Sequence, residues 1–412
     1  MERTRRSASV PIAASRPFGE SRKRHYGILG NLDRQPGRLA IEKFAADAWP
    51  QVARVWGDLV ANSPYTTFFL SSEWVEAWLE VFGSSLPVEI LIFRDSQRAV
   101  GACLLVRRTL RYGPFPVRCV FVNTTGEDEG QSPVIEFNNL LCLADWEQAV
   151  AAALISYINV RPWDEVWLNG FCQGPPLDAL NQACSGIPRE RVVRANFWVD
   201  LQRLRESGAS YESVLGSKDR ARLRQNFRSY GETEVVVPQD VGSALGMFQE
   251  LAELHTKSWQ SRNEPGAFAQ PVFRAFHEGL IRRCIVSRGV QLVLIRTASG
   301  PIGILYNMIY RGKVYFYQSG LAYSTNKRVR PGFVCLARTI QYCVEQPGLE
   351  EFHLMAGGDH YKEPMSTGRQ ELEWIVLQKA NLKNKAIRTL RHWKRRLFAR
   401  RQTTVAAEAT ES

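Results

Sequence analysis

The same order of predicted elements occurs twice along this chain of 412 residues. In each half, two segments whose apolar residues recur every three or four positions predict helices, and three apolar, β-branched runs predict successive strands. A further helix and one more strand complete each half. The first-half elements are predicted over residues 49–61, 72–83, 88–95, 99–108, 117–123, 146–158 and 164–170. The second-half elements are predicted over residues 243–259 and 271–286, the runs QLVLIRT, IGILYNMIY and KVYFYQS, a helix from Gly332 to about Glu345, and residues 350–357.

Individual residues repeat as well. Arg94 precedes Gly101 by seven positions and Arg296 precedes Gly303 by seven, in both cases across a strand, a turn and a second strand. The segment RPWDEVWLNG also resembles QPGLEEFHLMAGG, since each has a proline, a short turn with paired acids and then an aromatic-containing strand. Two matches in the same order indicate a tandem duplication.

Each repeat predicts an α/β fold. The three-strand meander is expected to be antiparallel, and the strand after the crossover helix should run parallel to its neighbour. A mixed sheet with helices on both faces satisfies this order of elements. We therefore predict two such domains, over residues 36–205 and 206–382.

The composition supports folded domains. Hydrophobic residues make up 45% of the chain and aromatic residues 11%, which excludes a largely disordered protein. No apolar run approaches the ~18 residues that cross a bilayer, and no apolar signal segment follows the N-terminus, so we expect a cytoplasmic protein. The eight cysteines have no metal-ligand spacing, and we expect reduced thiols and no metal site.

The net charge of +12 comes from the two ends of the chain. Residues 1–24 carry seven basic and two acidic side chains, and residues 383–401 carry nine basic and no acidic ones. We predict a disordered basic arm over residues 1–35 and a basic amphipathic tail over 383–412. The tail could lie on an anionic membrane, contact RNA, or remain a plain disordered tail.

The start of the helix after residue 330 is a candidate anion site. Lys327, Arg328 and Arg330 precede Pro331, which is suited to the first turn of a helix, so cations and free backbone N–H groups should meet there. A diphosphate fits such a site, and the alternative is a capped surface helix with solvated arginines. The matching loop of the first half, residues 123–139, has four acidic and no basic residues and should repel a diphosphate.

The segment after the last strand of the second repeat carries candidate catalytic groups, because loops at strand ends are where such sheets hold chemistry. Asp359 or His360 could act as a base and Tyr361 as an acid, while Lys362 could contact an anionic acceptor. The alternative is an ordinary polar turn built around Gly357 and its neighbour.

Two further groups are candidate substrate-binding residues. Lys218 and Arg222 lie in a basic helical stretch that could bind substrate phosphates, unless it is only a solvated face. Trp259 and Arg262 lie near the end of a predicted helix, where related sequences also place an aromatic and a cation; this resemblance implies an acceptor pocket, and the alternative is that they only pack that helix end.

The ordered set of segments resembles the acyl-CoA N-acyltransferase (GNAT) fold in its tandem form, as in the FemAB group and the CelD-like acetyltransferases associated with exopolysaccharide and cellulose production. The resemblance covers about residues 45–380. The residues that carry it are FFLSSEWVEAWLEVFG, SKDRARLRQNFR, RVRPGFVCLARTI and LMAGGDHYK.

The resemblance implies an acyl-CoA site at Lys327, Arg328, Arg330, Gly332 and Phe333, with the pyrophosphate at the helix start. The family loop reads roughly Arg/Gln-x-x-Gly-x-Gly/Ala, and this chain departs from it at Val334, where the second glycine is missing. The Tyr361 and Lys362 pair matches the CelD-like pattern. Because the first-half loop is acidic, we assign acyl-CoA to the second half and acceptor recognition or scaffolding to the first.

We therefore expect an acyltransferase that moves an acyl group, most simply acetyl, from acyl-CoA to an amine or hydroxyl of a sugar or cell-envelope precursor. One alternative is a FemAB-type transferase that uses aminoacyl-tRNA, the one nucleic acid expected here, and another is a non-catalytic scaffold of a polysaccharide system. The chain has no GxxxxGK[ST], HExxH, GxSxG or strand-linked GxGxxG, so nothing indicates nucleotide hydrolysis, zinc proteolysis, α/β-hydrolase chemistry or dinucleotide redox.

Overall fold

The described residues form one mixed sheet whose strand order is β1-β2-β3-β4-β6-β13-β7-β12-β11-β10-β9-β8, with β5 paired to β3 off this path. The computed structural model describes residues 39–128, 130–323, 329–357 and 362–389. All of them belong to one compact unit. The predicted arm over residues 1–35 lies outside the described residues.

The first half contains every element that the sequence pattern predicts. The matching elements are α1 (Trp49–Asn62), α2 (Ser72–Phe82), β2 (Val88–Asp95), β3 (Arg98–Tyr112), β4 (Phe115–Val122), α3 (Glu147–Asn159) and β6 (Glu165–Cys172). The pattern did not identify β1 (Ala40–Phe44), β5 (Leu141–Cys142), α4 (Pro175–Ala183) or β7 (Arg189–Asp200).

The second half repeats this order. The predicted elements are present as α7 (Val241–Gln260), α8 (Pro271–Cys284), β9 (Val290–Thr297), β10 (Gly300–Tyr310), β11 (Lys313–Leu321), α9 (Pro331–Val344) and β12 (Glu351–Ala356), and the basic stretch is α6 (Ser217–Tyr230). The elements not predicted are α5 (Leu201–Ser207), β8 (Glu234–Val236), β13 (Gly368–Gln378) and the short 3-10 helices, of which η2 (Phe68–Leu70) is in the first half.

The two crossovers have the predicted geometry. The meanders β2-β3-β4 and β9-β10-β11 are antiparallel. After each crossover helix, β6 runs parallel to β4 and β12 runs parallel to β11. The predicted α/β fold class, a mixed sheet flanked by helices in each half, is confirmed.

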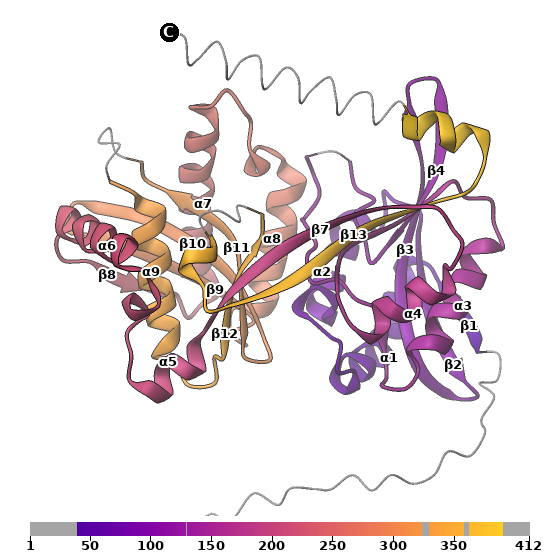
Figure 1. The fold of residues 1–412 in the computed structure, drawn as a ribbon, viewed down its shortest axis with the longest axis horizontal. Coiled ribbons are helices and arrows are strands. Elements are labelled where there is room, and N and C mark those ends of the chain that lie inside the picture. Colours follow the sequence, from indigo (N-terminus) through magenta and orange to yellow (C-terminus); the bar gives the residue numbers. More distant parts are fainter. Residues whose placement is uncertain (1–38, 129, 324–328, 358–361, 390–412) are drawn as a thin grey trace, which may run out of the picture. The chain divides into compact units, whose positions relative to one another are not determined.

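The last strand of each half lies in the sheet of the other half. Strand β13 pairs antiparallel with β6, and β7 pairs antiparallel with β12. The two exchanged strands also pair with each other over ten positions, from Gly368 opposite Trp198 to Leu377 opposite Arg189. They run side by side between the two groups of strands (Figure 1), so the sheet is continuous through both halves.

Helices cover the second-half strands on opposite faces. Tyr306 and Met308 of β10 pack in one buried cluster with Phe248 of α7. Leu305, the residue just before Tyr306 in the strand, packs in another cluster with Val334 of α9. Because successive strand residues point to opposite faces, α7 and α9 lie on opposite sides of the sheet.

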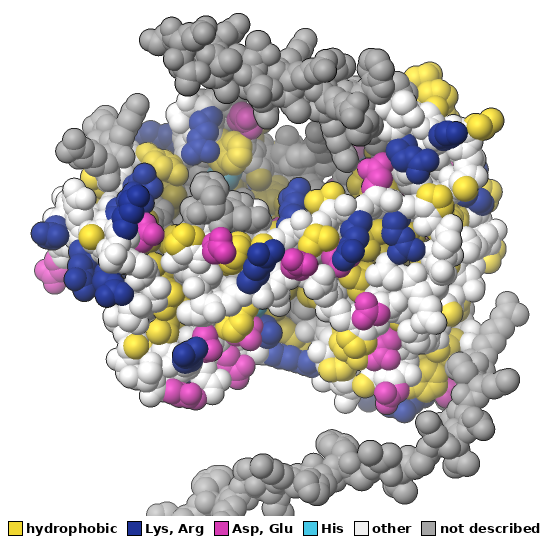
Figure 2. Space-filling model, viewed as in Figure 1, with side chains coloured by type: hydrophobic (Ala, Val, Ile, Leu, Met, Phe, Trp, Pro, Cys, Tyr) yellow, Lys and Arg dark blue, Asp and Glu magenta, His cyan; other side chains and the backbone are white. Residues whose placement is uncertain are grey.

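Charged side chains of both signs are mixed on the exposed face of the exchanged strands. Figure 2 shows Lys and Arg interspersed with Asp and Glu over β7 and β13. Arg191 forms an ion pair with Glu373, and Arg369 forms one with Glu371. The basic excess read from the sequence is therefore not gathered on this face.

The beginning of the predicted basic tail packs on the first half. Residues 382–389 are helical, the side chain of Ile387 is 1% exposed, and Lys383 Nζ lies 2.7 Å from Asp164 Oδ2. The rest of the tail, residues 390–412, lies outside the described residues. In the described part of the chain, the helices are too short or too polar to cross a membrane.

Candidate active site

Among the described residues, the second half of strand β11 has an open edge, with no strand paired on the side of β12. Its parallel pairing with β12 covers only Lys313–Tyr315, opposite Glu351–His353. Further along, β12 pairs on its other side with β7, where Ala356 lies opposite Asn196, while β11 continues to pair with β10 as far as Leu321. The two parallel strands part after Tyr315, so β11 can offer backbone N–H and C=O groups to a ligand at this edge.

A β-bulge lies where the two strands part. The β10–β11 register has Tyr306 opposite Gln318 and Asn307 opposite Phe316, so Tyr317 is the extra residue. A bulge disrupts the local ladder and turns the side chain of the extra residue, and such bulges are frequent beside active sites.

A pocket of about 410 Å³ opens at this edge. Its walls come from α7 on one face of the sheet and from α9 on the other, so it crosses the edge of β11. It brings together three residues predicted to bind substrate or cofactor: Trp259, Arg262 and Gly332. The residues that line it are His255, Ser258, Trp259, Arg262, Leu305, Phe316, Gln318, Ser319, Leu321, Tyr323, Gly332 and Leu336.

His255 is a titratable residue of this pocket that the sequence analysis missed. Its ring stacks on Trp259 at 5.6 Å between centroids, and the Arg262 guanidinium lies over the Trp259 ring, 5.6 Å from its centroid. The side chain is 5% exposed, and its Nδ1 is buried without a hydrogen-bond partner among the described residues. Burial, together with the charge of Arg262, lowers the pKa of His255 to about 4, so the imidazole is neutral at pH 7.

The start of α9 is held in place by α6. Pro331 occupies the first turn of α9, and Arg330, its N-cap residue, provides no side-chain cap. The backbone N–H of Arg330 instead donates to Asn226 Oδ1 on α6 at 2.6 Å, and Asn226 is 2% exposed. Phe333 lies in the first turn of α9 and packs against the core of that face. Lys327 and Arg328 lie outside the described residues.

Lys218 and Arg222, the predicted substrate-binding residues on α6, do not line this pocket. Lys218 is exposed, and Arg222 forms an ion pair with Asp219 at 3.1 Å on the same helix. The part of α6 that contacts the site is Asn226, through Arg330.

The predicted catalytic segment follows β12. Asp359, His360 and Tyr361 lie outside the described residues, so their predicted roles stay predictions. Lys362 is buried, and its Nζ donates to the carbonyl of Met355 at 2.9 Å and to that of Ala356 at 3.2 Å. The ammonium of Lys362 therefore holds the end of β12.

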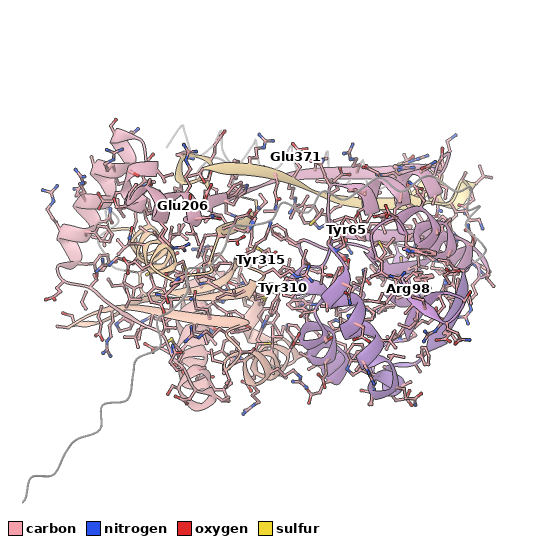
Figure 3. The ribbon with its side chains drawn as sticks, turned by 90° about the horizontal axis from the view of Figure 1, so that it is seen from below. Tyr65, Arg98, Glu206, Tyr310, Tyr315 and Glu371 are labelled. Carbon is pink, nitrogen blue, oxygen red and sulfur yellow. The ribbon has the colours of Figure 1, made fainter. Side chains whose placement is uncertain are left out.

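The acidic loop of the first half, residues 123–139, packs against β11 and β12 of the second half. Tyr315 of β11 lies near the middle of the view in Figure 3. Phe137 packs edge-on against Tyr315 at 4.8 Å and against His353 of β12 at 5.1 Å between ring centroids. Its neighbour Glu136 accepts a hydrogen bond of 2.8 Å from the backbone N–H of Ala356. The sequence identified this loop by its charge, but local patterns could not show that it meets the second half.

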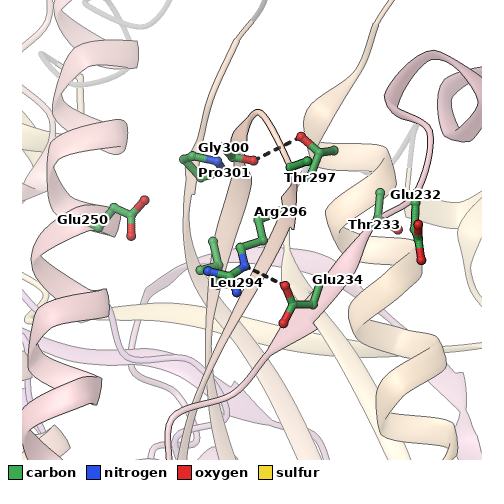
Figure 4. A pocket seen from close by; sticks show the side chains of 10 residues that line it. Glu232, Thr233, Glu234, Glu250, Leu294, Arg296, Thr297, Gly300 and Pro301 are labelled. Carbon is green, nitrogen blue, oxygen red and sulfur yellow. Dashed lines mark hydrogen bonds and ion pairs between the residues drawn. The ribbon is translucent and has the colours of Figure 1, made fainter.

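A larger hollow, of about 720 Å³, lies beside the far edge of the second half (Figure 4). It is lined by β8, β9 and the turn into β10, and Arg296 forms an ion pair with Glu234 at its surface. None of the predicted site residues lines it. The volume of a pocket therefore does not identify the candidate site. The pocket at the open edge of β11 is the candidate because predicted site residues line it.

Comparison with known proteins finds a family match in the second half. Residues 217–363 match the family model described as an acetyltransferase (GNAT) domain, so this part of the chain is similar to that domain. No curated protein matches the chain. The predicted GNAT resemblance is confirmed to this extent, while the CelD-like and exopolysaccharide associations stay predictions.

A solved structure shares the fold over most of the chain. The crystal structure of FemX is similar with a TM-score of 0.54 and 8% identity over 81% of this chain and 96% of that chain. The C-terminal domain of a putative lysylphosphatidylglycerol synthetase from Agrobacterium fabrum has a TM-score of 0.47 and 12% identity over 83% and 94%. A tandem GNAT protein from the clavulanic acid biosynthesis pathway has a TM-score of 0.44 and 13% identity over 82% and 98%. At 8% identity, the likeness to FemX shows a shared fold and nothing about substrate.

Proposed function

We propose that this protein transfers an acyl group, most simply acetyl, from acyl-CoA to an amine or hydroxyl group of a sugar or cell-envelope precursor. The observation that carries the proposal is the pocket at the open edge of β11, which has walls from both α7 and α9. The match of residues 217–363 to a GNAT domain supports transfer chemistry at this edge.

The donor would lie along β11 with its pyrophosphate at the start of α9. The amides of the pantetheine arm would pair with backbone groups of Phe316–Leu321, which β12 does not cover. The first turn of α9 offers N–H groups and the positive end of the helix dipole, and Arg330 adds a positive charge. Lys327 and Arg328 precede it in sequence and would add two more charges.

The bulge at Tyr317 would polarise the thioester. Its backbone N–H is displaced from the regular β10 ladder, and an oriented N–H can stabilise the oxyanion that forms when the acceptor attacks the carbonyl carbon. The remaining catalysis would be positioning in a ternary complex, with Asp359 or His360 as the base and Tyr361 as the acid that protonates the departing thiolate. Trp259 and neutral His255 would form a wall of the pocket at the acyl end.

Binding of acetyl-CoA tests this proposal. We expect acetyl-CoA to raise the melting temperature of the protein and aminoacyl-tRNA to leave it unchanged. Replacing Arg328 and Arg330 by alanine should weaken acetyl-CoA binding at least ~10-fold, since hydrogen bonds to charged groups contribute about 1.5–3 kcal/mol each. Isothermal calorimetry measures the change.

The control removes the same charge elsewhere. Arg224 and Arg228 lie exposed on α6, and their double alanine variant should bind acetyl-CoA as the unmodified protein does. Equal weakening in both variants would mean that only net charge matters, and stabilisation by aminoacyl-tRNA instead of acetyl-CoA would establish the FemAB-type donor. No response to either donor would favour the scaffold alternative.

A further inference from the structure

Arginines line a second pocket, of about 310 Å³, in the first half of the chain. The pocket lies where β3 and β4 approach their connecting turn, beside the turn from α3 into β6. None of the described residues that line it is acidic. The lining residues are Arg107, Arg108, Thr109, Arg118, Cys119, Val120, Arg161 and Pro162.

Three of these arginines lie on one face of the sheet. Arg118 is opposite Thr109, which is two positions from Arg107, so the side chains of both arginines point to the same face. Arg107 also lies over the ring of Tyr157 on α3, 5.9 Å from its centroid, which identifies the face as the one that α3 covers. Arg161 follows the end of α3 in the chain and lines the pocket from the same side.

Glu89 of β2 is shared by two of the arginines. It accepts a hydrogen bond of 3.1 Å from Arg107 Nε and one of 2.5 Å from Arg161 Nη1. One carboxylate cannot neutralise two guanidiniums, so one positive charge is left over. The Arg107 side chain is 16% exposed, and its Nη2 is buried without a hydrogen-bond partner among the described residues. Because a buried charged donor without a partner is costly, an acceptor bound in the pocket is favoured.

Asp164 is shared in the same way. Its Oδ2 accepts from Arg118 Nε at 3.0 Å and lies 2.7 Å from Lys383 Nζ. Lys383 belongs to the helix over 382–389, which lies beside β4 (Figure 1), and its Nζ also donates to the carbonyl of Pro116 at 2.9 Å. A second positive charge is therefore left over. The side chains of Arg118 and Arg161 are about half exposed, so a ligand can reach them.

Two other acids near these strands belong to the opposite face of the sheet. Arg108 and Cys119 are opposite each other in the β3–β4 register, and each alternates with residues of the arginine face. Arg108 pairs with Asp128 at 2.6 Å, and Glu165 Oε2 lies 3.9 Å from Cys119 Sγ. Neither of these two acids therefore faces the three arginines.

We propose that Arg107, Arg118 and Arg161 form a phosphate-binding site, which holds the phosphate group of a soluble ester or of a phospholipid headgroup. Guanidinium forks match the oxygens of a phosphate, and its negative charge would balance the positive charge left over by the two carboxylates. The Thr109 hydroxyl can donate one more hydrogen bond. The site adjoins the start of β4, whereas the acidic loop that packs on β11 follows the end of β4. The inference therefore does not depend on the proposed acyl-CoA site.

Thermal melts of the full chain test the site. Arg328 and Arg330 are first replaced by alanine, so that phosphate bound at the start of α9 does not contribute. Inorganic phosphate and glycerol 3-phosphate are then titrated against sodium chloride at equal ionic strength. We expect both phosphates to raise the melting temperature. Arg161→Gln and Arg107→Lys should each weaken the apparent affinity ~10-fold, since each loses hydrogen bonds to a charged ligand, and Arg107→Lys does so while keeping its charge.

Vesicles distinguish the two sources of the phosphate. The same proteins are co-sedimented with vesicles of phosphatidylglycerol and phosphatidylcholine, and with vesicles of phosphatidylcholine alone. If the phosphate belongs to a lipid headgroup, Arg161→Gln lowers the fraction bound to the phosphatidylglycerol vesicles. If it belongs to a soluble ester, that fraction is unchanged while the response to glycerol 3-phosphate falls. Either result supports the site and identifies its source.

Arg108→Gln is the matched control. It removes one positive charge from the neighbouring position of β3, but on the opposite face, and it should keep every response of the unmodified protein. Equal losses in Arg108→Gln and Arg161→Gln would show that only net charge matters. Responses that both Arg161→Gln and Arg107→Lys leave unchanged, or no response to either phosphate or to phosphatidylglycerol, would overturn the phosphate site.

Acetyl-CoA separates this inference from the proposed function. With Arg328 and Arg330 intact, Arg161→Gln should bind acetyl-CoA as the unmodified protein does. Failure of the unmodified protein to bind acetyl-CoA would count against the proposed donor and leave the phosphate site standing. A loss of acetyl-CoA binding in Arg161→Gln would contradict the assignment of two separate sites.

Discussion

Residues at matching positions of the two repeats make matching contacts. Arg94 of β2 forms an ion pair with Glu42 of β1 at 2.8 Å, and Arg296 of β9 forms one with Glu234 of β8 at the same distance. Both pairs join an outer strand of the sheet to its neighbour. Gly101 and Gly303 likewise lie under their crossover helices, the first against Val150 of α3 and the second against Cys335 of α9.

Gly320 of β11 lies near the candidate site at a position where the packing requires a glycine. A Cβ there would lie 2.4 Å from the backbone oxygen of Leu251, so α7 can cross β11 only where no side chain intervenes. Gly320→Ala should lower the free energy of unfolding by about 1–3 kcal/mol, the usual cost of overpacking, and weaken acetyl-CoA binding because α7 forms a wall of the pocket. Urea denaturation and calorimetry measure the two effects.

The matched substitution is Gly216→Ala at the N-cap of α6. Gly216 has a φ of −61°, and a Cβ there would meet nothing within 4 Å. Its stability should change by less than about 1 kcal/mol. If Gly320→Ala is equally well tolerated, the close approach of α7 to β11 is not a constraint on the site.

Elements far apart in the chain are joined by a few buried polar groups. Asp164, just before β6, accepts from the backbone N–H of Arg118 at 2.9 Å and from its Nε at 3.0 Å, and it also pairs with Lys383. Its backbone carbonyl accepts from Asn384 Nδ2 at 2.9 Å. One residue therefore ties β4 and the helix over 382–389 to the start of β6.

This arrangement predicts an acid-dependent loss of stability. Burial disfavours the Asp164 carboxylate, but the bonds from Arg118 and Lys383 outweigh burial and lower its pKa to about 2. A lowered pKa adds stability above the ordinary value near 4, and that stability is lost as the pH falls from about 4 through about 2. Asp164→Asn should destabilise the protein by about 1–3 kcal/mol at pH 7.

Thermal melts from pH 7 to pH 2 measure this contribution. The melting temperature of the unmodified protein should fall more steeply below pH 4 than that of Asp164→Asn, because the variant has already lost the contribution. Parallel curves for the two proteins would show that another carboxylate governs the acid transition.

For the molecule as a whole, the exchange of β7 and β13 joins the two halves into one folding unit. Without the partner half, β6 and β12 would each expose an unpaired sheet edge. Trp74 of α2 also packs on Phe276 of α8 at 4.9 Å between centroids, so the buried core continues from one half to the other. Neither half has its complete sheet within its own sequence.

The exchange predicts one unfolding transition. Differential scanning calorimetry should give a single peak with equal calorimetric and van't Hoff enthalpies, because neither half can unfold without removing a strand from the other. Two separable peaks would mean that the halves are independent despite the shared strands.

Local sequence patterns were sufficient to predict most helices and strands and part of the lining of the candidate site. The 3.6-residue period predicted α7 and α9, and a proline preceded by cations predicted the start of α9. Trp259, Arg262 and Gly332 were predicted from sequence and share one pocket. The strands β7 and β13 were missed because their pairing joins residues more than 150 positions apart, and His255 was missed because a lone histidine in an apolar helix resembles a core residue.

The sequence by itself determined that the chain is duplicated, that each half is α/β, and that positive charge gathers before α9 while the matching loop is acidic. These features follow from short-range periodicity and from charge, which do not depend on the rest of the fold. The tertiary structure alone decided that each half completes the other's sheet and that the acidic loop of the first half packs against β11 and β12 of the second. Such contacts depend on strand register and on close packing across the whole molecule, and local sequence patterns do not encode either one.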